Sequence, residues 1–167
     1  MRARDLQVAT PTVKRRTSAR EAGQLIAHGS GIGLVIANEA GVPEATVSAT
    51  DVLRLMLPGY VLEDFSLAHV LGEADSEEVW ENLEQRTIGE LVDDDAVPLH
   101  DLVVVNADDT VLEIAAAMVE AKSQLALVGP LVAGEAALIS LPDVMTAIVD
   151  ADRRRTAPTS GDGASAS

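Results

Sequence analysis

Two serine–aspartate pairs with identical spacing are the residues best suited to chemistry. Ser48 is followed three residues later by Asp51, and Ser140 is followed in the same way by Asp143. A carboxylate in the first turn of a helix can accept hydrogen bonds from both hydroxyls of a ribose. The serine hydroxyl and the free N–H groups of that turn can bind phosphate oxygens. Each pair could therefore hold the sugar and the phosphate of a nucleotide together.

The same spacing also has a purely structural explanation. Ser-x-x-Asp before an apolar helix is a common N-cap, in which the serine accepts a backbone N–H and an acid stands at the third helical position. One motif alone favours capping. Two copies at equivalent places favour ligand binding at one or both of them, and a residue can cap a helix and bind a ligand.

An internal repeat with a period of 92 residues contains both pairs. Each pair follows a β-type run and precedes an apolar helix. The capping-box spacing of Ser18 and Glu21 also recurs, as Thr110 and Glu113. When 92 is added to the residue numbers of 13–57, their pattern of strands and caps matches that of the later segment without a gap. We therefore predict two tandem β-α-β-β-α units.

The apolar periodicity places the elements of each unit. In the first unit we predict an extended segment at 11–13, a helix from Ser18 to Gly29, strands at 33–37 and 46–48, and a helix at about 50–57. In the second we predict strands at 103–105, 125–128 and 137–139, a helix that begins at Thr110, and a helix at about 141–149. The glycine-rich stretch 29–33 follows a helix and opens a strand, so it is interpreted as a helix stop and not as a dinucleotide loop.

Three further segments complete the predicted organisation. Residues 1–57 form the first repeat, 58–86 an acidic helical connector, 87–151 the second repeat and 152–167 a disordered tail without a packing face. Trp80 is expected to anchor the connector to the core. Asp93-Asp94-Asp95 is interpreted as a solvated acidic loop, with a hydrated Mg²⁺ as the less favoured alternative.

Composition argues against nucleic acid and membrane partners. The formal net charge is −15, and the basic residues are concentrated in the first 54 residues. DNA affinity depends on lysine and arginine, and single strands need stacking platforms, yet aromatic residues make up only 2% of the chain. The sequence has no apolar run of about 18 residues, as a membrane helix would need.

The sequence offers no recognisable catalytic or metal-ligating set. Without cysteine there is no thiolate nucleophile or cysteine-rich metal site, which suits a reducing cytoplasm. The three histidines, at 28, 69 and 100, show neither ligand spacing nor a Ser-His-Asp arrangement. We therefore expect a non-enzyme with no metal and no required cofactor; an enzyme acting on nucleotides is the weakest alternative.

Two tandem β-α-β-β-α units that each carry Ser-x-x-Asp before the last helix resemble the cystathionine β-synthase (CBS) domain pair, or Bateman module. The resemblance covers about residues 1–150. It implies an α+β (mixed α/β) fold in which the two repeats pack about a pseudo-twofold axis with a cleft on each side. It also implies a regulatory role, with AMP, ADP, ATP or S-adenosylmethionine as the ligand, in a homodimer that controls an unidentified protein.

The two clefts are expected to differ. Lys14, Arg15 and Arg16 lie before the first motif and should attract phosphates, whereas Asp108 and Asp109 should repel them. We therefore expect the Asp51 side to be the better site. A solvated basic edge without a binding role is an equally open interpretation of residues 14–16. Family members often have glycine three residues before the serine, where this chain has Ala45 and Ala137. A narrower cleft would favour the alternative function, a protein–protein interaction module that binds no small molecule.

Overall fold

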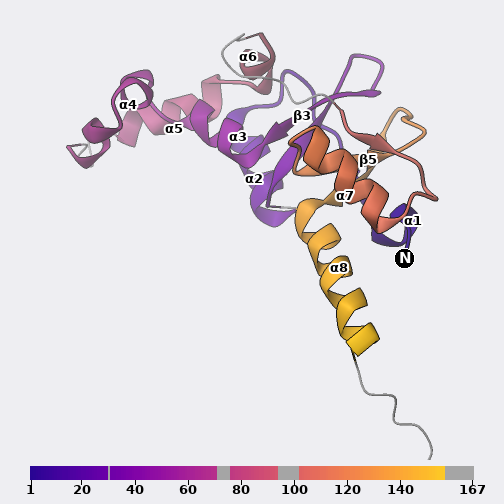
Figure 1. Ribbon diagram of the computed structural model, residues 1–167. Helices are drawn as coiled ribbons and strands as arrows, with labels where there is room; N and C mark the ends of the chain where they lie inside the picture. Colours follow the sequence, from indigo (N-terminus) through magenta and orange to yellow (C-terminus); the bar gives the residue numbers. More distant parts are fainter. Residues whose placement is uncertain (30, 71–75, 94–101, 157–167) are drawn as a thin grey trace, which may run out of the picture.

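The computed structural model describes residues 1–167 except 30, 71–75, 94–101 and 157–167 (Figure 1). The mixed α/β fold predicted from the sequence is confirmed. Its elements are α1 (Ala3–Leu6), β1 (Val8–Pro11), α2 (Ala19–His28), β2 (Gly33–Ala37), β3 (Pro43–Ser48), α3 (Ala49–Met56), α4 (Gly59–Glu63), the 3₁₀ helix η1 (Phe65–His69), α5 (Ser76–Gln85), α6 (Ile88–Asp93), β4 (Val104–Val105), α7 (Val111–Glu120), β5 (Leu125–Val128), β6 (Glu135–Ser140) and α8 (Leu141–Thr156).

The two units share one strand register, offset by 92 residues. Equivalent pairs are Gly33 with Ser48 and Leu125 with Ser140 in the antiparallel hairpins, and Val13 with Ile36 and Val105 with Val128 in the parallel contacts. Helices α2 and α7 also begin at equivalent residues, each after a capping hydroxyl that accepts a backbone N–H. The repeat is therefore a repeat of backbone hydrogen bonding as well as of sequence pattern.

Strand β1 belongs to the sheet of the second repeat. It pairs antiparallel with β6, and the sheet order is β1-β6-β5-β4, while β2 and β3 form a separate hairpin. From the sequence we expected only an extended segment at 11–13. The strand starts at Val8, because the free edge of β6 offers backbone partners to residues whose own pattern is weak.

The short helix that precedes each repeat packs into the core of the other repeat. In the second repeat, Ala3 of α1 is fully buried in the core, and its N–H donates to the Asp109 carbonyl over 2.9 Å. In the first repeat, Ile88 of α6 is buried in the core, and its N–H donates to the Thr17 carbonyl over 2.9 Å. Each lead-in segment thus ties the two repeats to one another.

A third apolar core lies between the repeats. It contains Val35 from β2 and the buried residues Leu125, Leu127, Ala136 and Leu138 of the second sheet. Val35 and Leu127 are equivalent positions of the repeat, so the two sheets meet through the same faces. Contact between equivalent faces of the two sheets is what a pseudo-twofold arrangement of the repeats requires.

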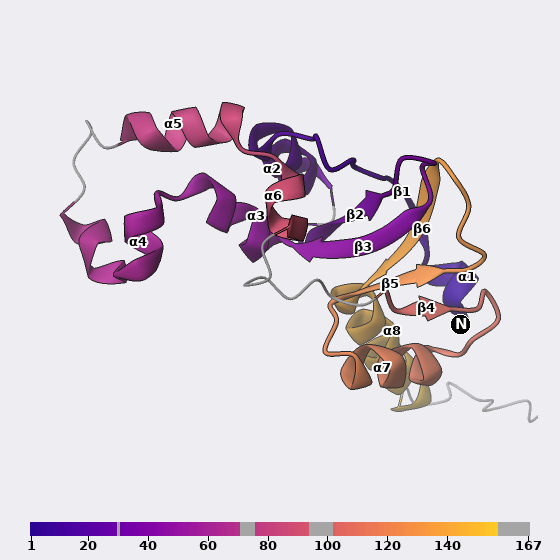
Figure 2. The ribbon, with the colours of Figure 1, turned by 90° about the horizontal axis from the view of Figure 1, so that it is seen from above.

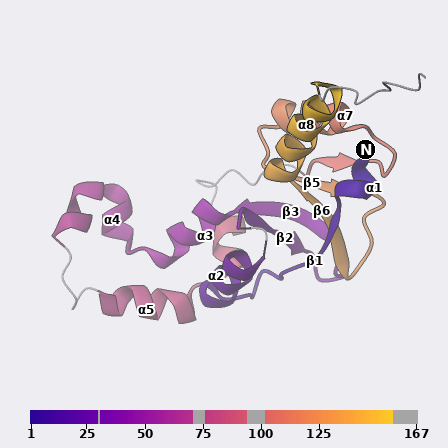
Figure 3. The same ribbon diagram turned by 90° about the horizontal axis from the view of Figure 1, so that it is seen from below.

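The connector is helical, as predicted, and forms an arm that extends from the first repeat (Figures 2 and 3). Its helix α5 packs on α2 and α3, where the Asn82 side-chain amide donates to the Met56 carbonyl over 3.4 Å. The prediction that Trp80 anchors the connector is wrong, because that side chain is 59% exposed. Val79 and Leu83 are the half-buried apolar residues of α5, and Trp80 lies about 100° around the helix from Val79.

The last helix is longer than its apolar pattern indicates. Helix α8 continues to Thr156, so residues 152–156, which we predicted to begin a disordered tail, are helical. Ion pairs between acids and arginines three residues apart support this end, with Arg153 paired to Asp150 over 3.7 Å and Arg155 to Asp152 over 3.6 Å. The rest of the predicted tail lies outside the described residues. No described helix combines the length and apolar character needed to cross a membrane.

Candidate functional site

Both serine–aspartate pairs form reciprocal capping boxes. The Asp51 N–H donates to Ser48 Oγ over 3.1 Å, and Asp51 Oδ2 accepts from the Ser48 N–H at 3.1 Å and the Ser48 hydroxyl at 2.7 Å. The corresponding distances at Ser140 and Asp143 are 3.4, 3.3 and 2.5 Å. Capping is therefore realised in both repeats.

The start of each final helix is fixed to the loop before the neighbouring strand. The Ala49 N–H donates to the Ile32 carbonyl over 2.6 Å, and the equivalent Leu141 N–H donates to the Gln124 carbonyl over 2.9 Å. With Asp51 N–H also capped, the first turn of α3 has fewer N–H groups to offer an anion than an uncapped helix has. Side chains must supply more of any anion binding here.

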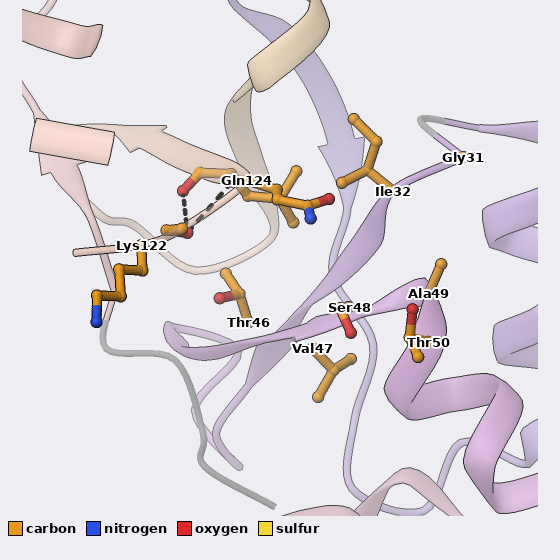
Figure 4. A pocket seen from close by; sticks show the side chains of 11 residues that line it. Gly31, Ile32, Thr46, Val47, Ser48, Ala49, Thr50, Lys122 and Gln124 are labelled. Carbon is orange, nitrogen blue, oxygen red and sulfur yellow. Dashed lines mark hydrogen bonds between the residues drawn. The ribbon is translucent and has the colours of Figure 1, made fainter. Parts of the chain in front are cut away.

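A cavity of about 320 Å³ lies between the two repeats beside the first pair. From the first repeat it is lined by Gly31, Ile32 and residues 46–50, and from the second by residues 122–125. Figure 4 shows Thr46, Ser48 and Thr50 on one side and Lys122 and Gln124 on the other. The volume is at the lower end of the range, about 300–1,000 Å³, that small-molecule sites occupy.

Asp51 does not line the cavity itself but is hydrogen-bonded to Ser48, which does. It is half-buried and holds Ser48 through Oδ2, and Oδ1 accepts no hydrogen bond from the described part of the chain. A hydroxyl that entered beside Ser48 would find an acceptor at Oδ1. The geometry therefore lets one carboxylate cap α3 and accept from a ligand.

The second pair is placed differently. Neither Ser140 nor Asp143 lines the cavity beside Ser48, and Ser140 is only 8% exposed. The cross-strand partner of Ser48 is Gly33, which has no side chain, whereas that of Ser140 is Leu125. Directly opposed residues of an antiparallel pair project on the same face, so Ser140 has a leucine as its neighbour where Ser48 has a glycine.

The alanines expected to narrow the clefts do not line this cavity. Ala45 is buried in the core of the first repeat, and Ala137 of β6 pairs with Ala9 of β1. The cavity beside Ser48 therefore does not depend on the absence of glycine at these two positions.

The basic residues 14–16 are not brought to the Ser48 cavity. They follow Val13, which bridges Ile36 near the turn between β2 and β3, whereas Ser48 pairs with Gly33 at the opposite end of that hairpin. Arg15 pairs with Glu44 at 3.3 Å and Asp93 at 3.0 Å. Lys14 and Arg16 line a separate hollow between residues 11–17 and α2.

The acids expected to weaken the second site bind α1 and the adjacent loop. Asp108 Oδ1 lies 2.5 Å from an Arg4 guanidinium nitrogen, and the Asp108 carbonyl accepts from Arg2. Asp109 Oδ2 accepts from the Asn106 N–H over 2.8 Å. These acids hold the N-terminal helix on the second repeat.

Sequence reasoning missed the side of the cavity that the second repeat supplies. Lys122, with a positive φ of 51°, provides a cation, and Gln124 provides an amide across from Ser48. The 92-residue offset aligns this loop with the stretch at 30–32, which we interpreted only as a helix stop. That alignment was the available signal, but it could not show which serine the loop would face. No cluster of three or more metal-ligating side chains is found among the described residues.

Comparison with known proteins finds its matches among solved structures. A CBS domain-containing protein of unknown function from Kribbella flavida is 30% identical, with a TM-score of 0.70, over 89% of this chain and 99% of that one. CBSX2 in complex with AMP is 17% identical, with a TM-score of 0.55, over 91% and 98%.

The CBS domain of a bacterial CNNM/CorC family Mg²⁺ transporter in complex with ATP is 16% identical, with a TM-score of 0.56, over 89% and 87%. The last two similarities speak to the fold alone. No protein-family model and no curated protein matches the chain.

Proposed function

The chain belongs to the family of CBS-domain proteins and consists of a pair of CBS repeats, and we propose that it is a non-catalytic regulatory module that binds an adenosine-containing ligand beside Ser48. The cavity between the repeats carries this proposal. Its lining includes Ser48 and Thr50 from the first repeat and Lys122 from the second, and Ser48 is hydrogen-bonded to the half-buried Asp51 carboxylate. The ligand class is AMP, ADP, ATP or S-adenosylmethionine.

Each group has a role in this proposal. Asp51 accepts a ribose hydroxyl through Oδ1, Thr50 donates to a phosphate oxygen, and Lys122 supplies the opposing charge. Ser48 donates to the phosphate only when its hydroxyl turns away from Asp51 Oδ2. CBSX2 with AMP and the CorC domain with ATP support the ligand class, since both share the fold. Because the ligand would contact both repeats, its binding would stabilise their packing. A module of this kind would act in the reducing cytoplasm and pass its state to a regulated protein.

The second pair and the basic residues take lesser parts. Ser140 and Asp143 are proposed as caps first, and as a ligand site only if the Leu125 side chain moves aside. Lys14, Arg15 and Arg16 are proposed to act on phosphates only at long range, because the cavity lining does not include them. We also propose that two copies of the chain associate as a homodimer.

A second function has its own support. In a protein–protein interaction module with closed clefts, both Ser-x-x-Asp pairs would serve only as caps. The complete capping boxes and the low exposure of Ser140 favour this alternative.

Isothermal titration calorimetry separates the two functions. The wild-type chain is titrated with AMP, ADP, ATP and S-adenosylmethionine, and Asp51→Ala is compared with Asp143→Ala as its matched control. Both variants lose the same capping box, so both should be destabilised by about 1 kcal/mol. We expect Asp51→Ala to weaken binding at least about tenfold and Asp143→Ala to leave it unchanged.

Equal affinities for wild type and Asp51→Ala would exclude the proposed site. Absence of heat and of a thermal shift with all four compounds would select the interaction module.

A further inference from the structure

The helix pairs of the two repeats differ in what covers them. In the first repeat, α5 lies on α2 and α3, where Arg20 pairs with Glu84 over 2.8 Å. Arg20 is equivalent to Leu112 of α7, which is 72% exposed. No described helix lies on α7 and α8 in the place that α5 takes on their counterparts (Figure 3).

The uncovered pair presents an apolar groove that ends at a cation. A hollow of about 340 Å³ between α7 and α8 is lined by Leu112, Ala147, Ile148, Ala151 and Arg154, among others. Further exposed apolar residues on the same two helices are Val119, Met145 and Val149. Arg153 and Arg155 pair with acids of α8, but Arg154 has no ion-pair partner among the described residues. The groove therefore suits an apolar occupant that carries negative charge.

The arm formed by α4, η1 and α5 has that chemistry. It holds the only tyrosine, phenylalanine and tryptophan of the chain, and all three are exposed: Tyr60, Phe65 and Trp80. Glu63 and Asp64 precede Phe65, and exposed glutamates flank Trp80. Aromatic side chains are the residues most enriched at binding hot spots, and exposed aromatics within an acidic surface fit an apolar groove beside an arginine.

We propose that the arm of one chain docks into the α7–α8 groove of a second copy. Figure 2 shows the arm and the α7–α8 pair at opposite ends of the molecule, so the arm does not cover the groove of its own chain. Two copies placed side by side in opposite directions make the contact twice, which closes a twofold dimer. This inference specifies the homodimer of the proposed function and does not depend on ligand binding.

The contact resembles one that already exists within the chain. Helix α5 packs on α2 and α3 with an acid against Arg20, and the proposed contact sets exposed aromatic residues of the arm against the equivalent helix pair near Arg154. Charge complementarity favours one orientation of the arm in the groove, because the arm is acidic and the end of α8 is basic.

Sedimentation velocity on the full chain without ligand tests this contact. We expect wild type to sediment with twice the chain mass of 17.4 kDa. Phe65→Ser with Trp80→Ser in the arm, or Leu112→Glu with Ile148→Glu in the groove, should each weaken association at least about 30-fold. Val132→Ser removes an equally exposed apolar side chain elsewhere and should change nothing. Circular dichroism melts verify that each variant folds.

Mixing gives the decisive result. The groove variant has an intact arm and the arm variant has an intact groove, so an equimolar mixture should recover one of the two contacts and associate more tightly than either variant alone. Emission from the single tryptophan should shift to shorter wavelength when wild type is concentrated, because docking covers Trp80.

A dimer that survives the arm substitutions but is lost with the groove substitutions would show helix-pair-to-helix-pair association and overturn the proposal. A wild-type monomer at 100 µM, on the order of the highest practical concentration, would also overturn it.

Discussion

In the first repeat Ser48 faces Gly33 across the hairpin and borders a cavity, whereas in the second repeat Ser140 faces Leu125 and is buried. The backbone is the same in both, since the register, the capping box and the helix start coincide after an offset of 92 residues. The residue opposite the serine is one of the side chains that differ between them. Duplicated backbones can thus keep a common fold while the side chains at equivalent positions differ.

The helix pairs on the outer surfaces of the two repeats differ as well. Helices α2 and α3 are covered by α5 of the same chain, whereas α7 and α8 expose Leu112 and Met145. The helix pair of the first repeat is therefore covered within the chain, whereas apolar side chains of the second helix pair are exposed. Four changes would break or sharpen this comparison.

The largest effect is expected from Gly33→Ala, which gives the first repeat a side chain where the second has one. A Cβ at this position would lie 2.2 Å from the Val47 carbonyl oxygen and 3.1 Å from Leu125 Cδ1. The backbone oxygen cannot move without breaking the hairpin, so unfolding free energy should fall by about 3 kcal/mol. Urea denaturation measures the loss.

Gly59→Ala is the control for this change. No atom lies within 4 Å of a Cβ added at Gly59, so the variant should stay within about 0.5 kcal/mol of wild type. If the two alanine variants were equally stable, close approach at Gly33 would not distinguish the repeats.

Removing the capping hydroxyl should lower the free energy of unfolding by the same amount in either repeat. Ser48→Ala and Ser140→Ala each remove the acceptor of one first-turn N–H, and each should lower unfolding free energy by about 1 kcal/mol. The thermal shift with AMP should decrease only for Ser48→Ala, because only Ser48 lines the cavity. A decrease of similar size in both variants would place ligands at both pairs.

The contribution of the second repeat to the cavity is tested by Lys122→Gln. Losing the ammonium should weaken AMP binding about fivefold, since one charge-assisted contact to phosphate is lost. Adenosine lacks the phosphate, so its affinity should be the same for variant and wild type in calorimetric titrations. Equal losses with AMP and adenosine would indicate a structural role for Lys122 instead.

The smallest effect is expected from Glu113→Gln, at the start of α7. Hydrogen bonds from the Thr110 N–H and hydroxyl lower the pKa of Glu113; desolvation and the charge of Asp109 oppose this effect, and Arg2 adds to it. Because the pKa is lowered in the folded state, ionised Glu113 stabilises the fold at pH values above its ordinary pKa of 4.5. This stabilisation is lost as the pH falls through the folded-state pKa. The stability difference between wild type and Glu113→Gln should therefore shrink below pH 4.5 in urea titrations.

Glu21→Gln is the matched control in the first repeat. Ser18 accepts the Glu21 N–H, but no reciprocal bond from the glutamate side chain closes a box there. Its stability difference from wild type should vary less with pH. Equal pH dependence in the two variants would mean that the reciprocal bond at Thr110 has no measurable effect.

Most of the local structure could be predicted because it is encoded locally. The hydroxyls of Ser18 and Thr110 accept the N–H groups three residues later, and the apolar runs at 33–37 and 125–128 form buried strands. Each signal depends on residues within one turn or one strand. The capped helices, the repeat period and the family resemblance follow from such signals.

Only the tertiary structure decided which sheet edge or helix face each segment packs against. The strand at Val8, the exchange of α1 and α6 between repeats, and the meeting of Lys122 with Ser48 all join residues far apart in sequence. Trp80 shows the same limit, because an apolar residue in an amphipathic helix can face the core or solvent, depending on the surface the helix packs against. The sequence by itself determined the two units and their caps, and long-range packing decided which of them has an open site.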